Sequence, residues 1–250
     1  MLSDPWSFAI AGFAVLLVGL SKSGFLSGLG VLGVPILTLV MPPVQAAAIL
    51  LPILISMDVV GVWAYRKDWD GRNLAILVPS AALGIGIAWA TAAYVTDAAV
   101  RLMVGGIGLL FTLDYWLKLR PHTTAQARVL PGLFWGLVAG FVSFISHAGG
   151  PPFQIYVMPQ RLKPVIYAGT SSMMFAAVNL LKVGPYLALG LFDRTSLHLS
   201  LMLIPLGPIG IYLGLWMVRR IPTEPFYKLA YALLLAVSIK LVADGVSGLL

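Results

Sequence analysis

The chain has 250 residues, of which 60% are hydrophobic and only 10% are charged, and its mean hydropathy is +0.96. Soluble domains average about 25% charged residues, so this composition indicates an integral membrane protein and excludes a sizeable soluble domain. The net charge of +7 comes from Lys and Arg that lie mostly at the ends of apolar segments. There they set orientation in a membrane, and we expect no nucleic-acid partner. The absence of cysteine excludes disulfides and Cys-ligated metals.

Clusters of charge and proline divide the chain into eight apolar segments. Most have about the 20 residues that a helix needs to cross a bilayer, which predicts an all-α polytopic membrane protein. The longest polar stretch, 118–128, divides the chain into a first repeat (1–117) and a second repeat (129–250). The eight segments are 6–40, 44–65, 73–94, 98–117, 129–158, 164–190, 197–218 and 226–248.

The first segment of each half is too long for one crossing and contains a run of small residues, SGLGVLGVP (27–35) and SHAGGPP (146–152). Such a break leaves backbone groups unpaired, which a bilayer tolerates only inside protein or beside a cavity. Breaks at corresponding places in two halves indicate a transporter's binding site near the midplane. We expect a full crossing plus a half-helix, or a re-entrant hairpin. The candidate ligand-binding residues at the breaks are Ser27, Gly28, Gly30, Gly33, His147, Gly149 and Gly150.

Helix ends at the breaks would present N–H groups to an anion. The alternative is that these glycines only let helices pack closely. His147, beside the second break, is a candidate proton relay or simply a hydrogen-bonded side chain.

The two halves match weakly when they are offset. A shift of 121 pairs Leu16 with Leu137 and Tyr65 with Tyr186, and a shift of 126 pairs Gly84 with Gly210. The positively charged loops change phase between the halves, which predicts inverted repeats. If the first segment is a single plain crossing, the repeats are parallel instead.

Three consecutive hydroxyl side chains, Thr170, Ser171 and Ser172, lie in the second half. They could donate hydrogen bonds to the oxygens of an anion. Alternatively they bond the carbonyls of their own helix one turn earlier, which would make them structural.

Asp58 and Asn179 occupy equivalent places inside apolar segments. A charge at the bilayer centre costs about 2.5–3.5 kcal/mol on insertion scales, so it normally faces a cavity or a partner. Asp58 could carry a proton, or it could pair with Lys22, Lys182 or Lys240. Asn179 could bond a ligand or the backbone of a break. Lys182 could balance an anion or extend to the interface, and Lys22 could add positive potential or pair with Asp58.

The motifs resemble a known family. The pattern GxxxxGxxxGLGVLGVPIL followed by AAAILLP, and the stretches GFVSFISHAGGPPFQIYVMPQ and AGTSSMMFAAVNLLKVGPYLALG, are similar to the two repeats of the sulfite exporter TauE/SafE family. The first break lacks the family's denser glycine cluster, and the second adds His147, so the substrate need not be sulfite.

The resemblance implies a multi-pass protein of the bacterial inner membrane that exports sulfite or another sulfur-containing or organosulfonate anion. Transport would be secondary, with Asp58 or His147 as candidates for proton coupling and Lys22 for charge balance. A passive anion channel and an intramembrane enzyme remain alternatives, although no catalytic motif is visible. The expected partners are a small anion and the lipid bilayer, a homodimer is left open, and no cofactor or metal is expected.

Overall fold

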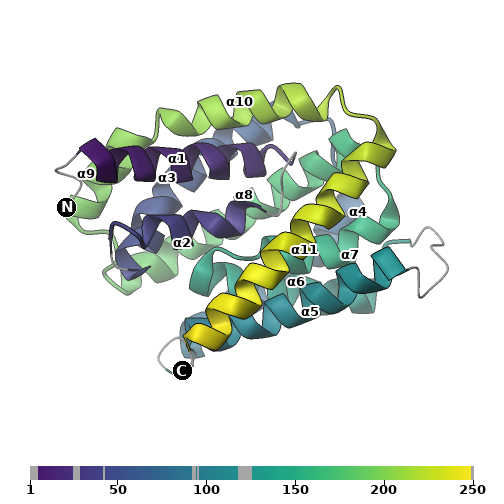
Figure 1. The fold of residues 1–250 in the computed structure, drawn as a ribbon, viewed down its shortest axis with the longest axis horizontal. Coiled ribbons are helices and arrows are strands. Elements are labelled where there is room, and N and C mark those ends of the chain that lie inside the picture. Colours follow the sequence, from purple (N-terminus) through teal and green to yellow (C-terminus); the bar gives the residue numbers. More distant parts are fainter. Residues whose placement is uncertain are drawn as a thin grey trace.

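The structure is a computed structural model that describes residues 5–24, 29–41, 43–91, 94, 96–117 and 126–248. This part of the chain is helical and contains no strand (Figure 1). The elements are α1 (Pro5–Lys22), η1 (Leu29–Leu32), α2 (Gly33–Leu37), α3 (Pro43–Ala64), α4 (Gly71–Thr91), α5 (Asp97–Leu117), α6 (Val129–Ser146), α7 (Gly150–Val157), η2 (Met158–Gln160), α8 (Pro164–Ala188), α9 (Arg194–Leu203), α10 (Leu206–Val218) and α11 (Thr223–Ser247).

Six of these helices are long and apolar enough to cross a membrane: α1, α3, α4, α6, α8 and α11. Helices α9 and α10 meet at an angle of 42° and would make a seventh span together. The expected single segment 197–218 is therefore bent, and the bend falls at Pro205, which has no N–H to continue the helix. The polytopic α-helical class is confirmed, whereas the described helices do not establish eight segments.

Both long first segments are divided at their small-residue breaks. Helix α1 ends at Lys22, and a short η1–α2 unit follows from Leu29. Helix α6 ends at Ser146, and the short helix α7 begins at Gly150. Each half therefore has a long helix followed by a short one, as the sequence predicts.

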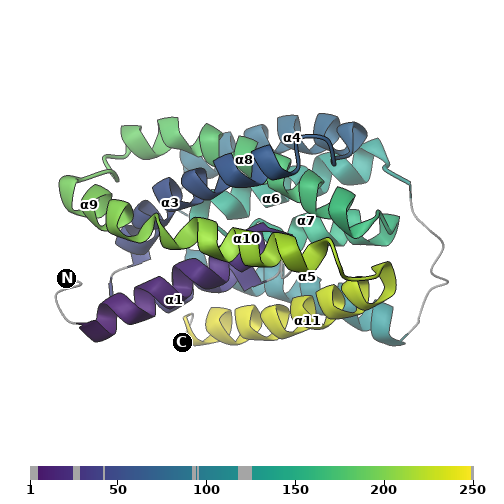
Figure 2. The same ribbon diagram turned by 90° about the horizontal axis from the view of Figure 1, so that it is seen from above.

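The first long helix of each half packs against the third segment of the other half. Gly84 on α4 lies against the backbone carbonyl of Leu137 on α6, and Gly210 on α10 lies against the carbonyl of Leu16 on α1; neither site has room for a Cβ. The two contacts correspond to each other, because Gly210 lies 126 positions after Gly84 and Leu137 lies 121 positions after Leu16. The α1–α10 pair is visible as neighbouring ribbons in Figures 1 and 2.

The same offset recurs in a hydrogen bond. The Tyr65 hydroxyl donates to the carbonyl of Ser23 at 2.5 Å, and the Tyr186 hydroxyl donates to the carbonyl of Phe144 at 3.0 Å. Both members of the second bond are 121 positions after those of the first. Each bond ties the C-terminal end of the first long helix of a half to the C-terminal end of the next long helix, α3 in the first half and α8 in the second.

Corresponding helices of the two halves run antiparallel where they meet. On α3 and α8, Asp58 contacts Asn179 while Gly61 contacts Ser172. On α5 and α11, Gly105 packs against residues 238–242 while residue 245 packs against residues 98–102. In both pairs, moving forward along one helix means moving backward along the other.

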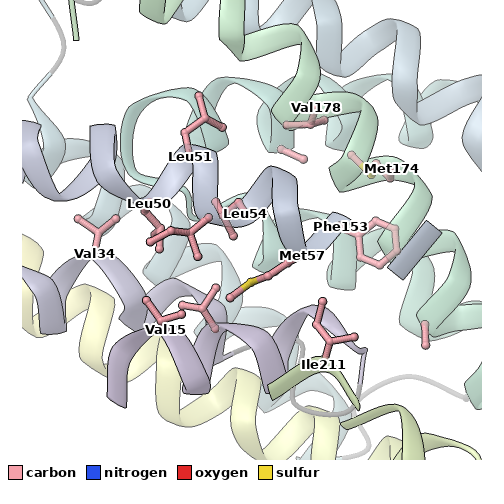
Figure 3. Packing of buried hydrophobic residues seen from close by; sticks show 14 of the residues in the cluster. Val15, Val34, Leu50, Leu51, Leu54, Met57, Phe153, Met174, Val178 and Ile211 are labelled. Carbon is pink, nitrogen blue, oxygen red and sulfur yellow. The ribbon is translucent and has the colours of Figure 1, made fainter. Parts of the chain in front are cut away.

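The apolar core surrounds α3. Leu50, Leu54 and Met57 of α3 lie between Val15 on α1 and Met174 on α8 (Figure 3). Lipid tails are as apolar as these side chains, so close packing rather than water exclusion holds such helices together. This core frames the polar cavity described next.

Candidate functional site

A cavity of about 70 Å³ lies where α1, η1, α3, α6, α7 and α8 meet. Four of its lining residues are apolar, namely Val18, Leu50, Leu54 and Phe175. Others carry hydroxyl, amide, amine and imidazole groups. These polar residues are Ser21, Lys22, Ser143, His147, Ser171, Ser172 and Asn179.

In the first half, the two buried charged side chains neutralise each other. Lys22 forms an ion pair with Asp58, so of the three lysines considered for Asp58 the structure selects the one on α1. The other oxygen of Asp58 accepts a hydrogen bond from Asn179 Nδ2 at 2.7 Å. Both side chains of the ion pair are largely buried, at 13% and 8% exposure. The pair therefore contributes no net charge to the cavity.

In the second half, the buried lysine has no carboxylate partner among the described residues. Lys182 is fully buried, so it does not extend to the membrane interface. Its ammonium donates to the carbonyl and hydroxyl of Ser143, both at 3.2 Å, and lies 2.9 Å from His147 Nδ1. No carboxylate of the described chain forms a salt bridge with it. Because a buried ion without a counter-ion costs several kcal/mol, this site favours an anion.

His147 is held in an unusual backbone conformation. It caps the C-terminus of α6 with φ +53°, the left-handed region that non-glycine residues rarely adopt. Its Nε2 lies 3.2 Å from the carbonyl of Ala47 on α3 and 3.4 Å from the Tyr186 hydroxyl. The backbone turn thus aims the imidazole across the break, where it contacts Lys182 and lines the cavity.

The three consecutive hydroxyls separate into two roles. Ser171 and Ser172 line the cavity, and neither has a hydrogen-bond partner within the described chain. Thr170 instead donates to the Ile166 carbonyl at 2.7 Å and accepts from the Asp70 N–H at 2.9 Å. Successive helical residues point about 100° apart, so one of the three faces away. The structure places Thr170 in the structural role.

The glycines of the breaks also divide. Gly30 and Gly150 line the cavity, although the N–H of Gly30 already donates to the Ser21 hydroxyl at 2.7 Å. Gly33 packs against Val18, and Gly149 packs against the carbonyl of Ala139. These two serve close packing, which was the alternative interpretation. Ser27 and Gly28 lie outside the described residues.

Sequence reasoning missed three polar residues of this region. Ser143 and Ser21 line the cavity, and Tyr186 contacts His147. The 121-residue offset could have identified Ser143, because it corresponds to Lys22. A fourth residue, Gln154 on α7, is fully buried, and neither of its amide atoms has a partner in the described part of the chain.

A bundle of helices long enough to span a membrane, around a small polar cavity, is typical of one class, the multi-pass membrane transport proteins. The family model of the sulfite exporter TauE/SafE matches residues 11–241. The chain therefore belongs to this family, as its motifs predict. Comparison with curated proteins and with solved structures found no match.

Proposed function

We propose that the protein is a secondary transporter of a small sulfur-containing anion across the bacterial inner membrane, and that the anion binds in the cavity between the two breaks. One observation carries the proposal: Lys182 is a fully buried lysine that forms no salt bridge with a carboxylate of the described chain, so its protonated form has no counter-ion there. An anion beside it would supply the missing counter-charge. The export direction rests on the family assignment.

The size of the cavity limits the substrate. A water-sized group needs about 10–15 Å³ of such volume, so 70 Å³ accommodates roughly five to seven such groups. Sulfite, thiosulfate and the smallest sulfonates fit this limit, and nucleotides and sugars do not.

The polar lining residues suit the oxygens of such an anion. Ser171 and Ser172 each offer a hydroxyl donor with no other partner in the described chain. Hydrogen bonds to charged groups contribute about 1.5–3 kcal/mol each. Asn179 lines the cavity beside them while its amide nitrogen is held by Asp58. The second half would thus supply most of the polar contacts.

We further propose that the halves are inverted repeats. Antiparallel contacts between α3 and α8 and between α5 and α11 support this, because a two-fold axis that reverses the helices lies in the membrane plane. The repeated Tyr65–Ser23 and Tyr186–Phe144 bonds support the duplication itself. Inverted repeats would let one half rock against the other around a central site.

Two measurements test the proposal. Purified protein should be stabilised against heat by sulfite, thiosulfate or a small sulfonate, because a ligand that binds only the folded state stabilises it by mass action. Stabilisation by carboxylates alone would contradict the sulfur assignment.

In proteoliposomes, unlabelled substrate inside should accelerate uptake of labelled substrate, as a carrier requires. A passive channel would show flux that follows the membrane potential without this counterflow.

A further inference from the structure

We infer that Lys182 and His147 form one protonatable unit that carries a single exchangeable proton, and that this proton moves together with one anion. The inference deepens the proposed function and rests on it. It assigns the coupling proton to the second half rather than to Asp58, and it predicts electroneutral transport of a monoanion.

The contacts of the imidazole fix where one of its protons lies. Nε2 faces the carbonyl of Ala47 at 3.2 Å, and a carbonyl can only accept. Its second neighbour, the Tyr186 hydroxyl, uses its own proton toward the carbonyl of Phe144 and so also presents a lone pair. Nε2 therefore carries a hydrogen. The remaining nitrogen, Nδ1, is the one that faces Lys182.

Only one proton fits between the two side chains. Lys182 Nζ and His147 Nδ1 are 2.9 Å apart, a normal hydrogen-bond length that needs one donor and one acceptor. Either the ammonium donates to a neutral imidazole, or an imidazolium donates to a neutral amine. If both groups were charged, two N–H groups would face each other. The unit therefore has a charge of +1 or 0.

The groups that face this unit leave its charge uncompensated. Lys22 on α1 and Asp58 on α3 cancel as an ion pair. From α6 the unit meets Ser143, and from its own helix it meets Tyr186, which keeps its proton on the Phe144 carbonyl. The net charge of the cavity is then the charge of the unit.

Burial penalises any state with net charge. The protonated unit with a bound monoanion is neutral, and so is the deprotonated unit without an anion. The two singly loaded states carry a net charge of +1 or −1. Proton and anion should therefore enter together from water on one side and leave together to water on the other, which couples their movements one to one.

Asp58 is poorly placed for this role. One of its oxygens pairs with Lys22, and the other accepts from Asn179. Protonating Asp58 would leave Lys22 without its counter-ion. The ion pair serves instead to hold α1, α3 and α8 together beside the cavity.

The test measures proton movement in proteoliposomes that contain a pH-sensitive dye. The probe anion is methanesulfonate, or ethanesulfonate if methanesulfonate is not carried, because both are monoanions that do not change their protonation near neutral pH. Wild-type protein should move one proton with each anion, and a pH gradient should drive anion accumulation. Anion transport without proton movement would overturn the inference while leaving the proposed function intact. Failure of both anions to move would count against the proposed function itself.

Two variants locate the proton. Lys182→Arg holds a permanent charge, so it should retain anion counterflow but lose proton movement and pH-driven accumulation. Lys182→Met, which removes a buried charge and is close to lysine in volume, should fold, bind anion weakly and move no proton. Lys163→Met is the matched control, because Lys163 is exposed at the N-terminus of the same helix and should behave as wild type. Accumulation driven by a pH gradient in either Lys182 variant would contradict the assignment.

Discussion

The two halves of the molecule hold their polar groups at corresponding positions but use them differently. In the first half Lys22 and Asp58 neutralise each other. The second half has Ser143 and Asn179 at these positions, because both offsets are 121. It adds a cation one helical turn beyond, at Lys182, whose ammonium bonds Ser143. The buried charges of the first half neutralise each other, whereas the buried amine of the second half has no counter-ion in the described chain.

Under the proposed function, this difference separates structural residues from binding residues within two similar helical arrangements. The shared contacts, such as the tyrosine bonds and the glycine crossings, hold the framework. Of the unshared residues, His147 and the serines of α8 line the cavity, and Lys182 lies next to it, in contact with His147 and Ser143. If the chain is a duplicated bundle, as proposed above, it keeps its packing in both copies while one copy carries the groups that we propose bind the anion.

The largest effect should come from breaking the closed pair. Asp58→Asn leaves Lys22 buried without a counter-ion, which typically costs about 3–5 kcal/mol. The double variant Lys22→Ser with Asp58→Asn copies the second half's Ser143 and Asn179 and should recover most of the loss. Thermal or denaturant unfolding in detergent measures both. A double variant no more stable than Asp58→Asn would show that the pair does more than neutralise itself.

Removing the unpaired hydroxyls should weaken binding without weakening the fold. Ser171→Ala and Ser172→Ala each remove a donor that would bond a charged ligand, so the free energy of anion binding should fall by about 1.5–3 kcal/mol. Thr170→Ala removes a hydroxyl bonded to Ile166 and Asp70 and is the contrasting control. It should lower stability and leave the anion dissociation constant unchanged. Equal binding losses in all three would mean that the cavity is not the site.

The glycine crossings should respond alike in the two halves. Gly84→Ala and Gly210→Ala each place a methyl group against a backbone carbonyl, and overpacking of this kind costs about 1–3 kcal/mol. Gly86→Ala is the control, since nothing lies within 4 Å of the added atom. Unfolding midpoints would compare the three. Strongly unequal losses at residues 84 and 210 would argue against a duplicated framework.

The smallest effect concerns the two tyrosines. Tyr65→Phe and Tyr186→Phe each lose one hydrogen bond to a carbonyl, a net cost of about 0.5–1.5 kcal/mol. Only Tyr186 lies near His147, at 3.4 Å. Its variant should therefore also change the pH dependence of anion flux, whereas Tyr65→Phe should not. Identical pH profiles would place His147 outside the coupling step.

Much of the fold follows from the sequence because composition and segment length dictate it. The division of both first segments is readable from their glycines and prolines. The pairing of Asp58 with a lysine is readable because charged residues are rare in apolar segments. The bend at Pro205 is not, because its counterpart Pro79 lies inside the continuous helix α4. The same residue gives two outcomes when its neighbours differ.

The site was less predictable for a geometric reason. The contact between Lys182 and His147 depends on how α8 crosses α6, over 35 positions of sequence. Helical rotation, not residue type, removes Thr170 from the cavity while leaving Ser171 and Ser172 in it. Periodicity alone does not fix either rotation.

The central claim is that the second half's open charge binds the anion. Crystals grown with selenite, the heavier analogue of sulfite, would test it through selenium anomalous diffraction. We expect one anomalous peak in the cavity, within hydrogen-bonding distance of Ser171 or Ser172 and on the Lys182 side, and no such peak in Lys182→Met crystals. A strong peak elsewhere with an empty cavity, or an unchanged peak in Lys182→Met, would contradict the account.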